Sequence, residues 1–274
     1  VATGSADGTA KLWDTSTGRT IQTISVEPGA SVPALAFSPD ASELITASSS
    51  GIQVWNAGNG LRSRLLARLP SSNNVGISPN QTWVVATAEF DPALRLYEYE
   101  TGNEIRMLRG HNNRLMSIGF SPDGRGILTA GDGGGGVQAQ LWDTETGAEI
   151  QAFKDCGVVI STDYSSDGRY VLLANDVGDA QLFDVETGQP IDNFRPSDSI
   201  GNAVSVAISP DNTYVLTGHE GGPGSFGPAK VWDLQTGTEI HTLSGHAGNV
   251  KSVAFSPDGN WILTGSNDTT ARDR

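Results

Sequence analysis

The sequence has few residues of the kinds that cross-link a chain or chelate a metal. It contains one cysteine, Cys156, and four histidines, His111, His219, His241 and His246. A single thiol cannot build an internal disulfide framework. The histidines are scattered through the chain and are not grouped at the spacings of a zinc site. We therefore expect no disulfide, no metal and no other cofactor.

Basic residues are also scarce. Lysine and arginine together number 17 against 31 aspartates and glutamates, which gives a formal net charge of −14. Such a chain repels nucleic acid and anionic membranes. The densest basic cluster, Arg62, Arg64 and Arg68, falls on one predicted strand and its exit, and is typical of a solvated face. No apolar run approaches the length of a membrane span. We expect a protein or peptide partner, no nucleic acid, no membrane and a cytoplasmic location.

The clearest positive signal is a unit of four short β-rich runs near the C-terminus. The runs are Ala229–Asp233, Glu239–Leu243, Val250–Ser256 and Trp261–Ser266. Gly237 supplies the positive φ that a tight hairpin loop needs, and the segment Ser-Pro-Asp-Gly at 256–259 is typical of a type I turn. The unit is therefore predicted to be an antiparallel meander, too small to bury its own faces.

The same unit recurs along the whole chain. An aromatic residue followed by a polar or acidic one marks each copy, at Trp13-Asp14, Trp55-Asn56, Tyr97-Glu98, Trp142-Asp143, Phe183-Asp184 and Trp232-Asp233. A glycine stands four residues after each pair, at Gly18, Gly60, Gly102, Gly147, Gly188 and Gly237. The spacing of about 42 residues is that of one four-stranded propeller blade. A β-sandwich does not repeat at such a fixed interval.

The chain has Trp-Asp pairs and the Gly-His pairs Gly110-His111 and Gly245-His246. With these motifs it resembles the WD-repeat β-propellers, and its repeats resemble those of prokaryotic members. The resemblance covers essentially the whole sequence. It implies an all-β protein, a seven-bladed β-propeller of four-stranded antiparallel blades.

We predict one propeller domain over residues 1–274. Complete blades are expected near 32–66, 73–108, 114–153, 158–194 and 203–243, and incomplete ones at 1–24 and 250–274. The first blade lacks its innermost strand and the last its outermost, which suggests a fragment lacking one strand pair, with other domains possible in a longer parent chain. The rival arrangement is a six-bladed ring in which Val250–Ser256 pairs with Val1–Ser5.

The resemblance also implies a buried hydrogen-bond network of histidine, serine or threonine, aspartate and tryptophan in each blade. The matching residues here are Ser5, Asp7, Trp13, His111, Trp142, Trp232, His246, Ser266 and Asp268. Other blades place Pro28, Arg68, Asp155 and Ser199 at the histidine position. The match is partial, so most blades are expected to rely on packing.

No catalytic constellation emerges from the sequence. The glycine run at 131–136 lacks the lysine and the helix of a phosphate-binding loop. The repeated Ser-Pro-Asp-Gly aspartates are turn residues. A propeller hydrolase or lyase, the alternative function, would need convergent polar residues at the channel mouth, where only Arg114, Asp163 and Lys251 stand. A lectin-like propeller would repeat its ligands in every blade, and this chain does not. We expect a non-catalytic protein-interaction scaffold in signalling.

Variation between blades is concentrated in the loops of one rim, and variable loops on a rigid scaffold are where proteins usually bind. The long insertion at 220–228 and the links between blades share this rim. The predicted partner-binding residues are Phe90, Asn113, Arg114, His219, Glu220, Phe226, Asn249 and Lys251. The opposite rim carries nearly identical turns that offer little to discriminate partners.

Overall fold

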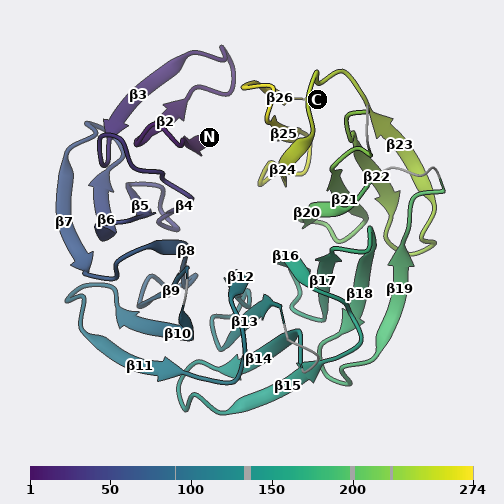
Figure 1. Ribbon diagram of the computed structural model, residues 1–274, viewed down its shortest axis with the longest axis horizontal. Helices are drawn as coiled ribbons and strands as arrows, with labels where there is room; N and C mark the ends of the chain where they lie inside the picture. The colour runs from purple at the N-terminus through teal and green to yellow at the C-terminus, as the bar shows by residue number, and fades with distance from the viewer. Residues whose placement is uncertain (90, 133–136, 198–200, 223–224, 274) are drawn as a thin grey trace.

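A computed structural model describes residues 1–89, 91–132, 137–197, 201–222 and 225–273. Within these residues all the regular structure is β-strand, and the strands form seven separate antiparallel sheets. The sheets are arranged as blades around a common centre in chain order, and both chain ends lie between the first and last blades (Figure 1). The prediction of a seven-bladed propeller is confirmed.

The first three blades contain the following strands: β1 (Ala2–Gly4), β2 (Thr9–Trp13) and β3 (Thr20–Ser25); β4 (Ala34–Phe37), β5 (Glu43–Ser48), β6 (Gly51–Asn56) and β7 (Arg62–Ala67); β8 (Ser72–Ile77), β9 (Trp83–Ala88), β10 (Asp91–Glu98) and β11 (Glu104–Leu108). The fourth and fifth contain β12 (Leu115–Phe120), β13 (Gly126–Gly131), β14 (Ala139–Asp143) and β15 (Glu149–Phe153); β16 (Val159–Tyr164), β17 (Tyr170–Asn175), β18 (Ala180–Asp184) and β19 (Pro190–Phe194). The last two contain β20 (Ala203–Ile208), β21 (Tyr214–His219), β22 (Ala229–Asp233) and β23 (Glu239–Leu243); β24 (Val250–Phe255), β25 (Ile262–Ser266) and β26 (Ala271–Asp273).

The strands of each complete blade run in order from the centre outward, from β4 to β7 in the second blade, for example (Figure 1). The first and last blades have three strands each, as predicted. The six-bladed rival is wrong, because β1 pairs with β2 while β24 pairs with β25 in a sheet of its own.

Two kinds of turn hold each four-stranded blade in register. Between the innermost and second strands of the fourth blade, Ser121 Oγ donates to Asp123 Oδ1 at 2.6 Å, and Gly124 follows with a φ of 72°. Between the third and outermost strands, Asp143 Oδ1 accepts the backbone N–H of Thr146 at 2.6 Å. Both turns place a carboxylate where it satisfies turn backbone or hydroxyl donors. We call the end of the propeller that carries these turns the turn rim.

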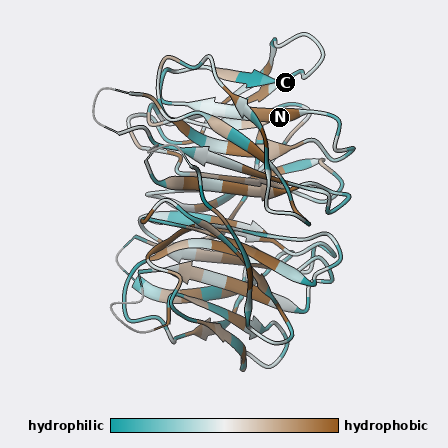
Figure 2. Ribbon diagram, turned by 90° about the vertical axis from the view of Figure 1, so that its right-hand side faces the viewer, coloured by the Kyte–Doolittle hydropathy of each residue, from teal (hydrophilic) through white to brown (hydrophobic). Residues whose placement is uncertain are grey.

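The opposite end is the link rim, formed by the links between blades and by the loops between second and third strands. Side-on, the hydrophobic segments lie mostly in the strands, while the loops extend to both sides (Figure 2). The hydrophobic cores lie between neighbouring blades. One core, for example, joins Ile45 and Val54 of the second blade to Val84 and Tyr97 of the third. Because a single blade cannot bury both of its faces, the fold depends on stacking neighbours.

Side-chain acceptors also join neighbouring blades around the central channel. Serines at one repeated position of the innermost strands accept backbone N–H groups of the next blade: Ser117 from Thr162 at 3.2 Å, Ser161 from Val206 at 3.3 Å and Ser205 from Val253 at 3.1 Å. The innermost strand is the edge of its sheet, so these bonds satisfy donors that lack a strand partner on that side.

The glycines of the turn rim provide a direct test of packing between blades. Gly18 and Gly102 have nearly the same φ, 65° and 72°. A Cβ on Gly18 would meet nothing within 4 Å, whereas a Cβ on Gly102 would lie 2.1 Å from the carbonyl oxygen of Leu66 in the preceding blade. We expect Gly18→Ala to cost about 1 kcal/mol through backbone strain alone and Gly102→Ala about 2 kcal/mol or more. Urea unfolding of both variants measures the difference, and equal costs would show that the blades do not touch there.

Candidate functional site

The fourth blade contains a buried polar network on its two central strands. Thr129 Oγ1 accepts a hydrogen bond from Nε1 of Trp142 at 2.8 Å and lies 2.8 Å from Nε2 of His111. The threonine is fully buried, and both rings are buried as well. His111 comes from the link, Thr129 from β13 and Trp142 from β14. The network therefore ties the entry of the blade to its centre.

The hydroxyl of this network recurs wherever the blade has a tryptophan. Trp13 donates to Thr3 at 2.9 Å, Trp55 to Thr46 at 2.9 Å, and Trp232 to Thr217 at 2.9 Å. The blades with Tyr97 or Phe183 instead have Ala86 or Leu173 at the threonine position. An indole N–H needs an acceptor when buried, whereas phenylalanine does not.

The prediction that Ser5 and Ser266 supply this hydroxyl is wrong. The residues that supply it stand two positions earlier, at Thr3 in the first blade and Thr264 in the last. Ser5 and Ser266 instead accept the backbone N–H groups of Asp7 and Asp268, at 3.3 and 3.1 Å. The serines therefore shape the loop after the strand.

The last blade keeps the histidine and aspartate of the network. Asp268 Oδ2 lies 2.9 Å from Nδ1 of His246, whose Nε2 lies 2.9 Å from Thr264 Oγ1. In the fourth blade the arrangement is incomplete, because Nδ1 of His111 has no hydrogen-bond partner among the described residues. Burial lowers the pKa of His111 to about 4, so its imidazole is neutral at physiological pH.

His219 does not belong to a partner-binding surface. It is fully buried at the end of β21, with Nε2 2.8 Å from Thr217 Oγ1 and Nδ1 3.4 Å from the carbonyl oxygen of Gly201. It therefore occupies, in the sixth blade, the place beside the threonine that a link histidine takes in the fourth. This corrects the prediction for His219.

The remaining predicted residues of the sixth and seventh blades lie together on the link rim. Asn249 Oδ1 accepts the backbone N–H groups of Gly221 and Gly227, at 3.0 and 3.1 Å, and so holds the base of the long loop. Lys251 forms an ion pair with Glu220 across the same junction. Phe226, on this loop, is 62% exposed. The loop is therefore anchored through its backbone, while its aromatic side chain faces solvent.

The fourth blade contributes Asn113 and Arg114 to the same rim. Both are exposed, and Asn113 Nδ2 donates to Asp132 Oδ2 at 3.3 Å. Val177 lies in the loop after β17, in the fifth blade, and is 61% exposed. The sequence did not single it out. Its isolated position in a polar turn gave no periodic signal. Phe90 and the glycines at 133–136 lie outside the described residues.

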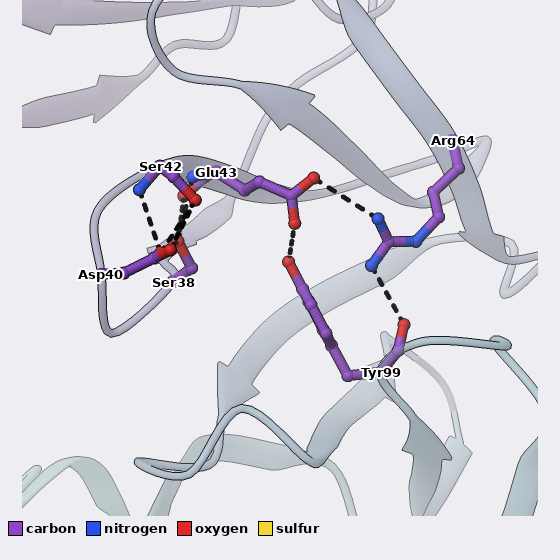
Figure 3. Close-up of polar contacts among 6 residues, drawn as sticks. All are labelled: Ser38, Asp40, Ser42, Glu43, Arg64 and Tyr99. Carbon is purple, nitrogen blue, oxygen red and sulfur yellow. Dashed lines mark hydrogen bonds and ion pairs between the residues drawn. The ribbon is translucent and has the colours of Figure 1, made fainter.

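The most conspicuous polar cluster elsewhere joins the second and third blades at the turn rim (Figure 3). The Tyr99 hydroxyl donates to Glu43, and Arg64 donates from Nη2 to the Tyr99 carbonyl oxygen at 3.1 Å. The Arg64 guanidinium also lies 4.6 Å from the centre of the Tyr99 ring. Tyr99 is 1% exposed, so this tyrosine is closed to a substrate. The cluster braces two blades.

Other candidate chemistry is limited in the part of the chain that the structure describes. It contains no group of three or more His, Cys, Asp or Glu side chains arranged to hold a metal. Cys156 is buried, and burial raises the pKa of its thiol to about 12, which leaves the thiol protonated and unreactive. The described residues form no helix long and apolar enough to cross a membrane.

Seven radial sheets with this tryptophan and threonine network define a β-propeller built from WD-type blades. A model of the "WD domain, G-beta repeat" family matches residues 1–14, 18–56, 102–134 and 237–272. This match and the seven-bladed fold support assignment of the chain to the WD-repeat β-propeller family.

Several curated proteins are similar to the chain. Nuclear distribution protein PAC1 of Arthroderma otae is 30% identical over 154 residues, 52% of this chain and 33% of that protein. The U3 small nucleolar RNA-associated protein 21 homolog of Schizosaccharomyces pombe is 31% identical over 131 residues, 47% of this chain and 14% of that protein. Autophagy-related protein 16 of Arabidopsis thaliana is 25% identical over 249 residues, 88% of this chain and 46% of that protein. The chain thus spans less than half the length of each of these relatives.

Proposed function

We propose that this chain is a non-catalytic scaffold that binds a protein partner on its link rim, across the fourth to seventh blades. The observation that carries the proposal is the exposed Phe226 on a loop whose base is fixed by Asn249. An exposed aromatic side chain on an anchored loop is a suitable binding hot spot, because little order must be gained on binding. Val177 adds a second exposed apolar side chain to the rim.

The relatives support a binding role in general terms. Among them are serine-threonine kinase receptor-associated proteins of Gallus gallus and Bos taurus, 28% and 26% identical over 148 residues. Their names describe association with a receptor. The alternative, an enzyme with a site at the channel mouth, has less support because the described residues around Asp163 include no second ionisable side chain in the cavity there.

The test is a double variant, Arg114→Ala with Phe226→Ala. Both side chains are exposed, so folding stability should change little. We expect binding to weaken by about 2 kcal/mol or more, which is the loss of a hot spot. Partners captured with the wild-type protein are identified first, and the dissociation constant of the purified partner is then measured by calorimetry for wild type and variant.

The matched control changes the opposite rim, with Glu145→Ala and Gln235→Ala in the Thr-Gly turns. This control should bind as the wild type does. If the control variant loses binding while the Arg114 and Phe226 variant keeps it, the partner docks on the turn rim and the proposal is wrong.

A further inference from the structure

A cavity of about 300 Å³ opens at the turn-rim end of the central channel, between the fifth, sixth and seventh blades. Its wall is mostly apolar and includes Pro210, Val253, Phe255 and Pro257. Asp163, on β16, is the one ionisable residue among those that line it. This volume is at the lower end of the range for small-ligand sites and suits a single side chain.

Asp163 breaks the pattern of its position. The equivalent residues of the other innermost strands are small: Ala36, Gly76, Gly119, Ala207 and Ala254. A Cβ on Gly119, one blade earlier, would meet nothing within 4 Å, so this position can face open space. Asp163 therefore places a carboxylate at a position where the other innermost strands have only the hydrogen of glycine or the methyl group of alanine.

One oxygen of this carboxylate is already occupied. Oδ2 of Asp163 accepts the backbone N–H of Ile208 at 2.8 Å, which fixes the side chain against the next blade. No ion pair to Asp163 forms among the described residues. Burial raises the pKa of the carboxyl to about 6, so it is charged at neutral pH and gains from a cationic partner.

The surrounding rim also favours a cation. In five blades the turn between the innermost and second strands has a serine hydroxyl that donates to an aspartate, which lowers the pKa of these carboxyls: Asp40, Asp123, Asp167, Asp211 and Asp258. All are ionised at neutral pH and lie in turns at the same rim as the cavity. Such a field attracts a basic ligand and repels an acidic one.

We propose that this cavity is a second binding site, which takes the side chain of a lysine or arginine from an extended peptide. The cationic head pairs with Asp163, and the aliphatic stem packs against Pro210, Val253 and Phe255. Long basic side chains bury their methylene stems while pairing their heads. The site is at the opposite end of the propeller from the proposed link-rim surface and does not depend on it.

The experiment uses the peptide acetyl-Ala-Ala-Lys-Ala-Ala-amide, and the same peptide with norleucine for lysine. Binding is followed by NMR on protein with ¹³C-labelled aspartate carboxyls. The lysine peptide should shift the Asp163 signal saturably, lower the carboxyl pKa by about one unit and bind about 10-fold more tightly than the norleucine peptide. The arginine peptide should behave as the lysine peptide does.

Asp163→Asn removes the charge and keeps an oxygen for the Ile208 N–H. It should lose about 10-fold in affinity for the lysine peptide, whereas Glu186→Gln, which removes an exposed charge from the same rim, should lose little. If Asp163→Asn does not fold, the experiment uses Asp163→Gly instead, because the fourth blade has a glycine, Gly119, at the equivalent position. Equal binding by wild type and either Asp163 variant, equal binding of the two peptides, or no saturable shift of Asp163 would overturn the proposal.

Discussion

Replacing Thr129 with valine is expected to lower the free energy of unfolding by about 3 kcal/mol. The substitution keeps the shape of the side chain but removes the oxygen that Trp142 and His111 both contact. Each buried polar group left without its partner costs about 1–3 kcal/mol. Urea denaturation, followed by tryptophan fluorescence, measures the loss.

Thr46→Val is the matched control in the second blade. Thr46 is equally buried, but its hydroxyl contacts one ring nitrogen only, Nε1 of Trp55 at 2.9 Å. We expect it to cost about half as much as Thr129→Val. Thr129→Ser keeps the oxygen and should cost about 1 kcal/mol. If the two valine variants are equally destabilised, His111 contributes nothing to the network.

Acidification is expected to destabilise the protein through His111. Its pKa is about 4 in the folded protein and 6.5 in the unfolded chain. The unfolded state therefore binds a proton first as the pH falls, so the stability from this residue is complete above pH 6.5 and is lost between pH 6.5 and 4. The full loss is about 3 kcal/mol, and about 2 kcal/mol of it falls between pH 8 and pH 5.

The measurement is the difference in unfolding free energy between wild type and His111→Gln at several pH values. The difference isolates the imidazole from carboxyls that titrate in the same range, such as Asp163. His241→Gln removes an exposed imidazole and should keep the wild-type pH dependence. A His111→Gln protein that loses as much stability as wild type between pH 8 and pH 5 would contradict this explanation.

The repeat made the fold predictable, because a hydrophobic period and a glycine register of about 42 residues leave few architectures open. The strands and turns follow from local residue chemistry, as at Ser121 and Asp123. The incomplete first and last blades were predictable for the same reason, since each missing strand leaves a gap in a known pattern.

The polar network was less predictable, because it depends on contacts across strands. Thr3 and Thr264 are two residues before Ser5 and Ser266, and nothing in the sequence of either blade separates the hydroxyl of the threonine from that of the serine. The signal in the sequence was that two positions change together. Four blades combine threonine with tryptophan, whereas the blade with Tyr97 has an alanine and the blade with Phe183 has a leucine at the threonine position. The prediction for His219 was wrong because a histidine at a strand end looks exposed in the sequence. In the structure its side chain is fully buried, and its Nδ1 lies 3.4 Å from the carbonyl oxygen of Gly201 in the link.

The serine acceptors on the innermost strands have a consequence for how this propeller can meet other chains. A sheet edge with free backbone N–H groups is a template onto which a foreign strand can add. From the fourth blade to the seventh, Ser117, Ser161 and Ser205 already occupy donors of the next edge, each pointing the same way around the ring. A peptide that enters the channel there is therefore recognised through its side chains. Its backbone has little opportunity to add as a strand to this part of the channel wall.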